Sequence, residues 1–152
     1  MFKMMRKRKA KGFTLVELLI VMVIIGILAG AMLLVMGSGK DKANATKIVS
    51  NLRSLKAAAL MCYSDYGTWP TDIDSLSPYM DRTVPTSGDA LANYAVESTS
   101  DDFYIKATLG TDAGTGVQEK LADMADENGL YSDTSGTTYS SGNDVYVRVG
   151  SL

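Results

Sequence analysis

The stretch that decides the fold covers residues 12–30 and reads GFTLVELLIVMVIIGILAG. From Leu18 to Met36 the chain continues for 19 residues without a charge, which is long enough for a helix that crosses a bilayer. Glu17 is the acidic residue at the start of this apolar segment. A carboxylate at the centre of a membrane helix costs about 2.5–3.5 kcal/mol, and less near the helix end. The sequence therefore predicts a membrane helix and raises the question of what neutralises Glu17.

Charge is distributed unevenly along the chain. Residues 1–12 contain no acid and six basic residues: Lys3, Arg6, Lys7, Arg8, Lys9 and Lys11. Such a cluster holds an N-terminus in the cytoplasm and directs the following chain across the membrane. Of the 15 basic and 17 acidic residues, nine basic and all 17 acidic ones remain in residues 13–152, a net charge of −8. This balance argues against a nucleic-acid-binding protein.

The composition also limits catalysis. The chain has no histidine and one cysteine, Cys62, so Ser-His-Asp and Cys-His centres and the usual zinc sites are excluded. No intramolecular disulfide can form. Because no nucleophile–base pair or metal-ligand cluster is visible, we expect neither an enzyme, nor a catalytic residue, nor a cofactor.

Residues 40–66 have the apolar periodicity of a helix that packs through one face. The residues on this face are Ala45, Ile48, Leu52, Leu55, Ala59, Cys62 and Tyr66. Together with the membrane segment they predict one long helix over residues 13–66, with a buried thiol at Cys62. Gly67 and Pro70 are expected to end it. Gly37 and Gly39 interrupt the pattern, and a short linker and a functional hinge are equally compatible with them.

The remaining sequence predicts a small sheet. Residues 102–109 and 144–149 alternate apolar and polar side chains, as half-buried strands do, and residues 93–98 do so more weakly. Residues 116–129 predict a short helix that turns Val117, Leu121 and Met124 inward and stops at Gly129. The expected fold is α+β, with the long helix packed on a small antiparallel sheet.

The start of the apolar segment resembles the N-terminal motif of type IV pilins and type II secretion pseudopilins. The motif residues are Gly12, Phe13, Thr14, Leu15, Val16 and Glu17, followed by LLIVMVIIGILA. The resemblance implies a pilin-like fold with three parts. These are a leader peptide, residues 1–12, that is removed; a transmembrane and filament-core helix, residues 13–36; and an extracytoplasmic domain, residues 40–152, that includes the second half of the helix.

The resemblance also implies a processing route and partners. A prepilin peptidase would cleave between Gly12 and Phe13 and methylate the new amine of Phe13. The subunit would sit in the inner membrane as a single-pass protein with a cytoplasmic N-terminus. Inner-membrane assembly machinery would then build it into an extracytoplasmic homo-oligomeric filament, with Phe13, Thr14 and Glu17 as assembly residues.

In this family Glu17 would neutralise the Phe13 amine of a neighbouring subunit. Opposite charges attract more strongly in an apolar medium than in water, and each is costly there alone. Two other readings stay open: the carboxylate reaches the cytoplasmic interface, or it bonds the amine of its own chain.

The chain departs from the family pattern in two places, and a third feature leaves a metal site unassigned. Leu34 stands where many members have a proline, and the C-terminal cysteine pair of many pilins is absent. Major pseudopilins bind calcium in a C-terminal loop, where this chain has Asp133, Asn143 and Asp144. These are suitable oxygen ligands, but polar turns are commonly acidic, and we assign no metal site.

The sequence thus favours a structural subunit of a type IV pilus-like filament. One alternative is a type II secretion pseudopilin that drives protein export. Another is a membrane-anchored binding module that does not assemble.

Overall fold

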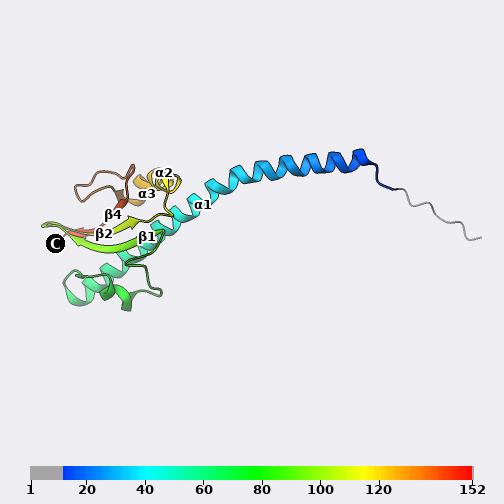
Figure 1. Cartoon of the computed structure of the whole chain (residues 1–152). Coiled ribbons are helices and arrows are strands. Elements are labelled where there is room, and N and C mark those ends of the chain that lie inside the picture. Colours follow the sequence, from blue (N-terminus) through cyan, green and yellow to red (C-terminus); the bar gives the residue numbers. More distant parts are fainter. Residues whose placement is uncertain (1–11, 152) are drawn as a thin grey trace, which may run out of the picture. The chain divides into compact units, whose positions relative to one another are not determined.

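One long helix, α1, runs from Leu15 to Tyr66 in the computed structural model, which describes residues 12–151 (Figure 1). The chain divides between Gly37 and Ser38 into two compact units, and α1 contributes to both. We call the described part up to Gly37 the N-terminal unit and residues 38–151 the C-terminal unit. The first part of α1 is long and apolar enough to cross a membrane. The basic residues expected in the leader, up to Lys11, lie outside the described residues.

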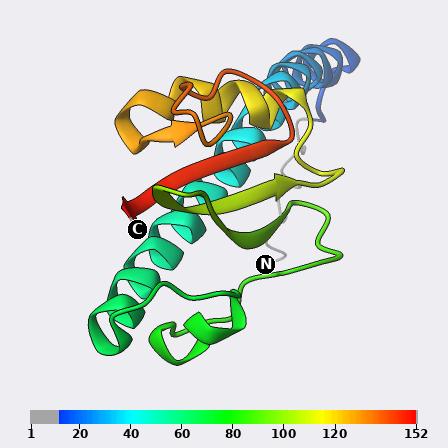
Figure 2. The same ribbon diagram turned by 90° about the vertical axis from the view of Figure 1, so that its left-hand side faces the viewer.

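A four-stranded antiparallel sheet forms one layer of the C-terminal unit (Figure 2). Its strands are β1 (Ala92–Ser98), β2 (Asp102–Leu109), β3 (Leu130–Tyr131) and β4 (Asp144–Ser151), in the order β1-β2-β4-β3. The strands expected at 102–109 and 144–149 are confirmed, and β4 extends two residues further. The weaker prediction at 93–98 corresponds to β1. β3 was not predicted, because two residues are too few to show an alternation.

The second half of α1 packs on one face of this sheet and forms the core with it. Ile48, Leu52 and Leu55 of the helix and Ile105 of β2 are fully buried, as the periodicity predicted. Tyr66 was expected on the same face, but it is 72% exposed. Periodicity identifies which face of a helix is apolar, but not how far the partner layer extends along it.

The helix ends as expected, and a tryptophan closes the junction behind it. Trp69 stacks between Tyr63 of α1 and Phe103 of β2, with ring centroids 4.3 and 4.9 Å apart. Its Nε1 donates a hydrogen bond to the Ser151 carbonyl at 3.2 Å. A Cβ at Gly150 would lie 2.7 Å from the indole ring, so the close approach of β4 requires glycine there. A 3₁₀ helix, Asp74–Tyr79, follows this junction and was not predicted.

The helix expected at 116–129 is divided into α2 (Thr115–Asp123) and α3 (Ala125–Asn128). Val117 and Leu121 are fully buried, which confirms their inward orientation. Met124 is partly buried and packs against the core. Gly129 follows α3 with a left-handed φ of 61°, the conformation that ends many helices.

Candidate assembly site at the start of the long helix

A reciprocal pair of hydrogen bonds joins Thr14 and Glu17 at the start of α1. The Glu17 amide donates to Thr14 Oγ1 at 3.2 Å, and the Thr14 amide donates to Glu17 Oε2 at 3.1 Å. The Thr14 hydroxyl also donates to Oε2 at 3.0 Å. This is a capping box, in which each side chain satisfies an amide that the first helical turn leaves without a partner. It explains why α1 begins at Leu15 rather than at Phe13.

The capping box fixes the Glu17 carboxylate without using all of its acceptor capacity. An ionised carboxylate has about four acceptor positions. Within residues 12–151, the hydrogen bonds of the Glu17 side chain all use Oε2. The carboxylate is therefore oriented by its own chain and keeps acceptor positions for another donor.

The predicted cleavage and assembly residues lie together. Gly12, Phe13, Thr14 and Glu17 line a shallow depression of about 380 Å³. Residues 12–14 precede the helix, and the Phe13 side chain is 86% exposed. The Gly12–Phe13 peptide bond thus lies in non-helical, accessible backbone, the form in which a protease can bind a chain.

The apolar part of α1 that follows has no packing partner within the described residues. Twelve large apolar side chains from Leu18 to Leu33 are each between 51% and 73% exposed: Leu18, Leu19, Ile20, Val21, Met22, Val23, Ile24, Ile25, Ile27, Leu28, Met32 and Leu33. Burial of one such side chain contributes roughly 1.5–3 kcal/mol. This surface requires a membrane or another apolar helix to cover it.

The candidate calcium ligands have other partners. Asp133 Oδ1 accepts hydrogen bonds from Ser135 and Thr137, and the Ser135 hydroxyl bond lowers the Asp133 pKa to about 2. Asp144 forms an ion pair with Lys106 at 3.0 Å. Among the described residues there is no group of three His, Cys, Asp or Glu side chains that could hold a metal ion.

Comparison with known proteins identifies the family. Residues 7–33 match the model of the prokaryotic N-terminal methylation motif. Fimbrial protein EcpC of Eikenella corrodens is 33% identical over 117 residues, which cover 76% of this chain and 74% of that protein. The chain belongs to the type IV pilin and type II secretion pseudopilin family. The relatives found are named as fimbrial and secretion-system proteins, not as enzymes.

Other relatives of this pilin-like chain come from secretion systems. Type II secretion system core protein G of Klebsiella michiganensis is 40% identical over 82 residues, 53% of this chain and 58% of that protein. The same protein of Aeromonas hydrophila is 34% identical over 67% of this chain and 66% of its own length. The matches thus span about three fifths of the length of these secretion relatives.

The fold agrees with the family. The structure of the major type IV pilin PilA1 from Clostridium difficile aligns with a TM-score of 0.53. The alignment covers 74% of this chain and 98% of the pilin, at 22% sequence identity. The predicted pilin-like α+β fold is confirmed.

The capping box is the feature of this pilin-like chain that the sequence reasoning missed. Its signal was present, because Thr14 and Glu17 form the pattern Thr-x-x-Glu before an apolar run. The charge of Glu17 in an apolar run indicated instead a partner in another subunit. Every interpretation of Glu17 therefore has to include its hydrogen bonds with Thr14 of the same chain.

Proposed function

We propose that the chain is a structural subunit of a type IV pilus-like filament, assembled through its N-terminal helix. The observation that carries the proposal is the start of α1. There an oriented carboxylate with remaining acceptor positions adjoins an apolar surface that the described part of the chain leaves uncovered. Neighbouring copies would supply both a cationic partner and an apolar cover.

In this proposal a prepilin peptidase cleaves between Gly12 and Phe13 and methylates Phe13. The products are a leader of residues 1–12 and a positively charged amine at Phe13. The capping box orients Glu17, and Glu17 pairs with the Phe13 amine of the next copy. Since each charge is costly alone in an apolar environment, the pair favours one stagger between subunits over others.

The proposed location follows from the same segment. Residues 13–36 cross the inner membrane once, with the basic leader in the cytoplasm and residues 40–152 outside. Assembly machinery of that membrane then moves the subunits into the extracytoplasmic filament.

A type II secretion pseudopilin is the second candidate function. The relatives named core protein G of that system favour it, whereas the fimbrial relative covers a larger share of both chains. Both candidates use the same processing and helix assembly. They differ in whether the filament is a surface pilus or a periplasmic structure that drives export.

The experiment is a comparison of Glu17→Val with the wild type in cells that contain the peptidase and the assembly machinery. Intact-mass analysis should show that both chains begin at N-methylated Phe13, because Glu17 supplies no group to the cleavage. Membrane levels should be similar, because valine removes a burial cost. Sheared filaments should be lost from Glu17→Val alone. Retention of residues 1–12 in the wild type, or normal filaments from Glu17→Val, would contradict the proposal.

A further inference from the structure

Two neighbouring grooves follow the side of α1 beside α2 and α3. One has a volume of about 380 Å³ and is lined by Thr46, Val49, Ser50, Arg53, Ser54, Met124, Glu127 and Asn128. The other, of about 340 Å³, is lined by Ser38, Lys42, Lys120, Asp123 and Met124. Met124 lines both, so we treat them as one feature, the α1–α2 groove. Each part equals the liquid volume of about a dozen waters, which leaves room for side chains from another molecule.

The α1–α2 groove has an excess of positive charge. Lys120 is paired with Asp123 at 2.9 Å within the groove. Lys42 and Arg53, in contrast, form no ion pair with another described residue, although Glu127 also lines the groove. Both side chains are exposed. The groove thus offers two cations against one unpaired carboxylate.

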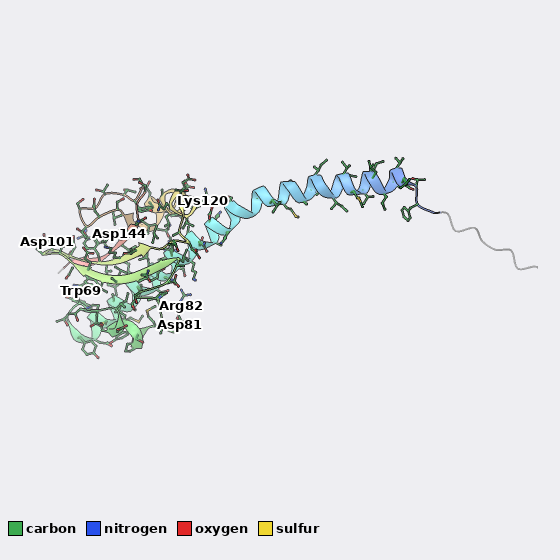
Figure 3. All side chains as sticks on the ribbon, viewed as in Figure 1. Trp69, Asp81, Arg82, Asp101, Lys120 and Asp144 are labelled. Carbon is green, nitrogen blue, oxygen red and sulfur yellow. The ribbon has the colours of Figure 1, made fainter. Side chains whose placement is uncertain are left out.

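The β1–β2 turn, residues 99–101, carries a carboxylate at the end of the same unit away from Lys120 (Figure 3). Figure 3 shows Asp101 and Lys120 at opposite ends of it. Asp101 is exposed, and its side chain accepts a hydrogen bond from the neighbouring Ser100 hydroxyl at 3.2 Å. The following Asp102, in contrast, is already engaged by Arg148.

The β1–β2 turn is held in one conformation by its own hydrogen bonds. The Thr99 amide donates to the Asp102 carbonyl at 2.9 Å, and the Asp102 amide donates to Thr99 Oγ1 at 3.0 Å. A turn that is already ordered loses little conformational entropy when it binds. The turn contains the small polar residues Ser100 and Asp101 between the two strands.

We propose that the β1–β2 turn of one copy docks into the α1–α2 groove of the next, with Asp101 beside Arg53. This inference rests on the proposed filament function and names a contact between its subunits. Because the two surfaces are different, the contact is head-to-tail. Head-to-tail contacts that do not close generate helical filaments.

The charges near the contact give it direction and specificity rather than most of its strength. An exposed ion pair contributes up to about 1 kcal/mol, but the contact repeats at each subunit of a filament. A like-charge pair in the same place is more costly than a missing pair. Charge reversal is therefore a stronger test than neutralisation.

The first measurement is cross-linking in filaments of the full chain. Ser50→Cys places a thiol in the groove, and Ser100→Cys places one on the turn. Cys62 is only 5% exposed and stays unreactive. A short bismaleimide should join the chain with both introduced cysteines into a ladder of covalent oligomers, whereas a chain with either introduced cysteine alone should give no ladder. Intact filaments without a ladder would overturn the inference and leave the proposed function standing.

The second measurement adds charge changes to the double-cysteine chain. Asp101→Lys and Arg53→Glu should each lower the cross-linked fraction about tenfold, because each brings like charges together. The two changes combined should restore it to within about twofold of the parent.

Two matched control variants make the same kinds of charge reversal at positions outside the proposed contact. Asp81→Lys alters an exposed acid outside the turn, and Lys47→Glu alters an exposed cation of α1 that does not line the groove. Both should leave the ladder unchanged. Equal loss in the controls, or no recovery in the combined variant, would overturn the inference. If the wild-type chain formed no filaments at all, this result would instead contradict the proposed function.

Discussion

The two units of the chain bury their apolar side chains in different ways. In the C-terminal unit, Ile48, Leu52 and Leu55 of α1 are fully buried against the sheet. In the N-terminal unit, the large apolar side chains that the structure describes in the same helix are more than half exposed. Both halves are rich in Leu, Ile and Val, so composition alone does not explain the difference. One half carries its partner layer in its own sequence, and the other depends on a membrane or on other copies.

The largest expected effect is on solubility and oligomeric state, when the C-terminal unit is produced without the N-terminal unit. Removal of residues 1–37 deletes the uncovered apolar surface and leaves the core of the C-terminal unit intact. The shortened chain should be a water-soluble monomer with a cooperative thermal transition, whereas the full chain requires detergent. Gel filtration and circular dichroism would check this. A shortened chain that is unfolded or aggregated would show that the C-terminal unit is not self-sufficient.

A smaller effect is expected from a single substitution in the core. Leu52→Ala removes a fully buried side chain and should lower the free energy of unfolding of the shortened chain by about 2–5 kcal/mol. Ala57→Gly would change the exposed side of the same helix, and it should cost only about 1 kcal/mol through helix propensity. Denaturant titrations of both variants would measure the difference. Equal losses would mean that Leu52 is not a core residue.

The smallest expected effect is on the pH dependence of folding stability, through the loop that contains Asp133. Hydrogen bonds from Ser135 and Thr137 lower the Asp133 pKa from 3.8 to about 2 in the folded chain. A lowered folded-state pKa gives a stabilising contribution that is present above the unfolded pKa and is lost as the pH falls toward 2. The stability difference between wild type and Asp133→Asn should therefore shrink between pH 4 and pH 2. A difference that is constant over this range would contradict the hydrogen-bonded loop.

The sequence predicted the parts of this fold that have a clear period. The 3.6-residue pattern through Leu52 and the alternation through Ile105 identified the two surfaces that form the core. The pattern did not predict β3 or the 3₁₀ helix at Asp74–Tyr79, because short elements are determined by tertiary contacts. It also placed Tyr66 in the core, since one helix face looks the same whether or not a sheet covers it.

The candidate site was predicted in its residues but not in its geometry. The family motif located Gly12, Phe13, Thr14 and Glu17, which lie around one depression in the structure. The hydrogen bonds of Glu17 to Thr14 were not predicted, because a charge in an apolar helix indicates a partner in another copy as well. A local Thr-x-x-Glu pattern was equally visible. Glu17 therefore has two candidate roles, as a cap of its own helix and as a charge for its neighbour.

Glu17→Gln separates these two roles most directly. Glutamine keeps a side-chain oxygen that can accept the Thr14 amide, as capping boxes with Gln do, but it has no charge. The measurement is the yield of sheared filaments relative to the amount of processed subunit in the membrane. If the charge pairs with the Phe13 amine of another copy, this ratio should fall at least tenfold while processing and membrane level stay unchanged. A wild-type ratio would contradict the account and leave Glu17 as a helix cap alone.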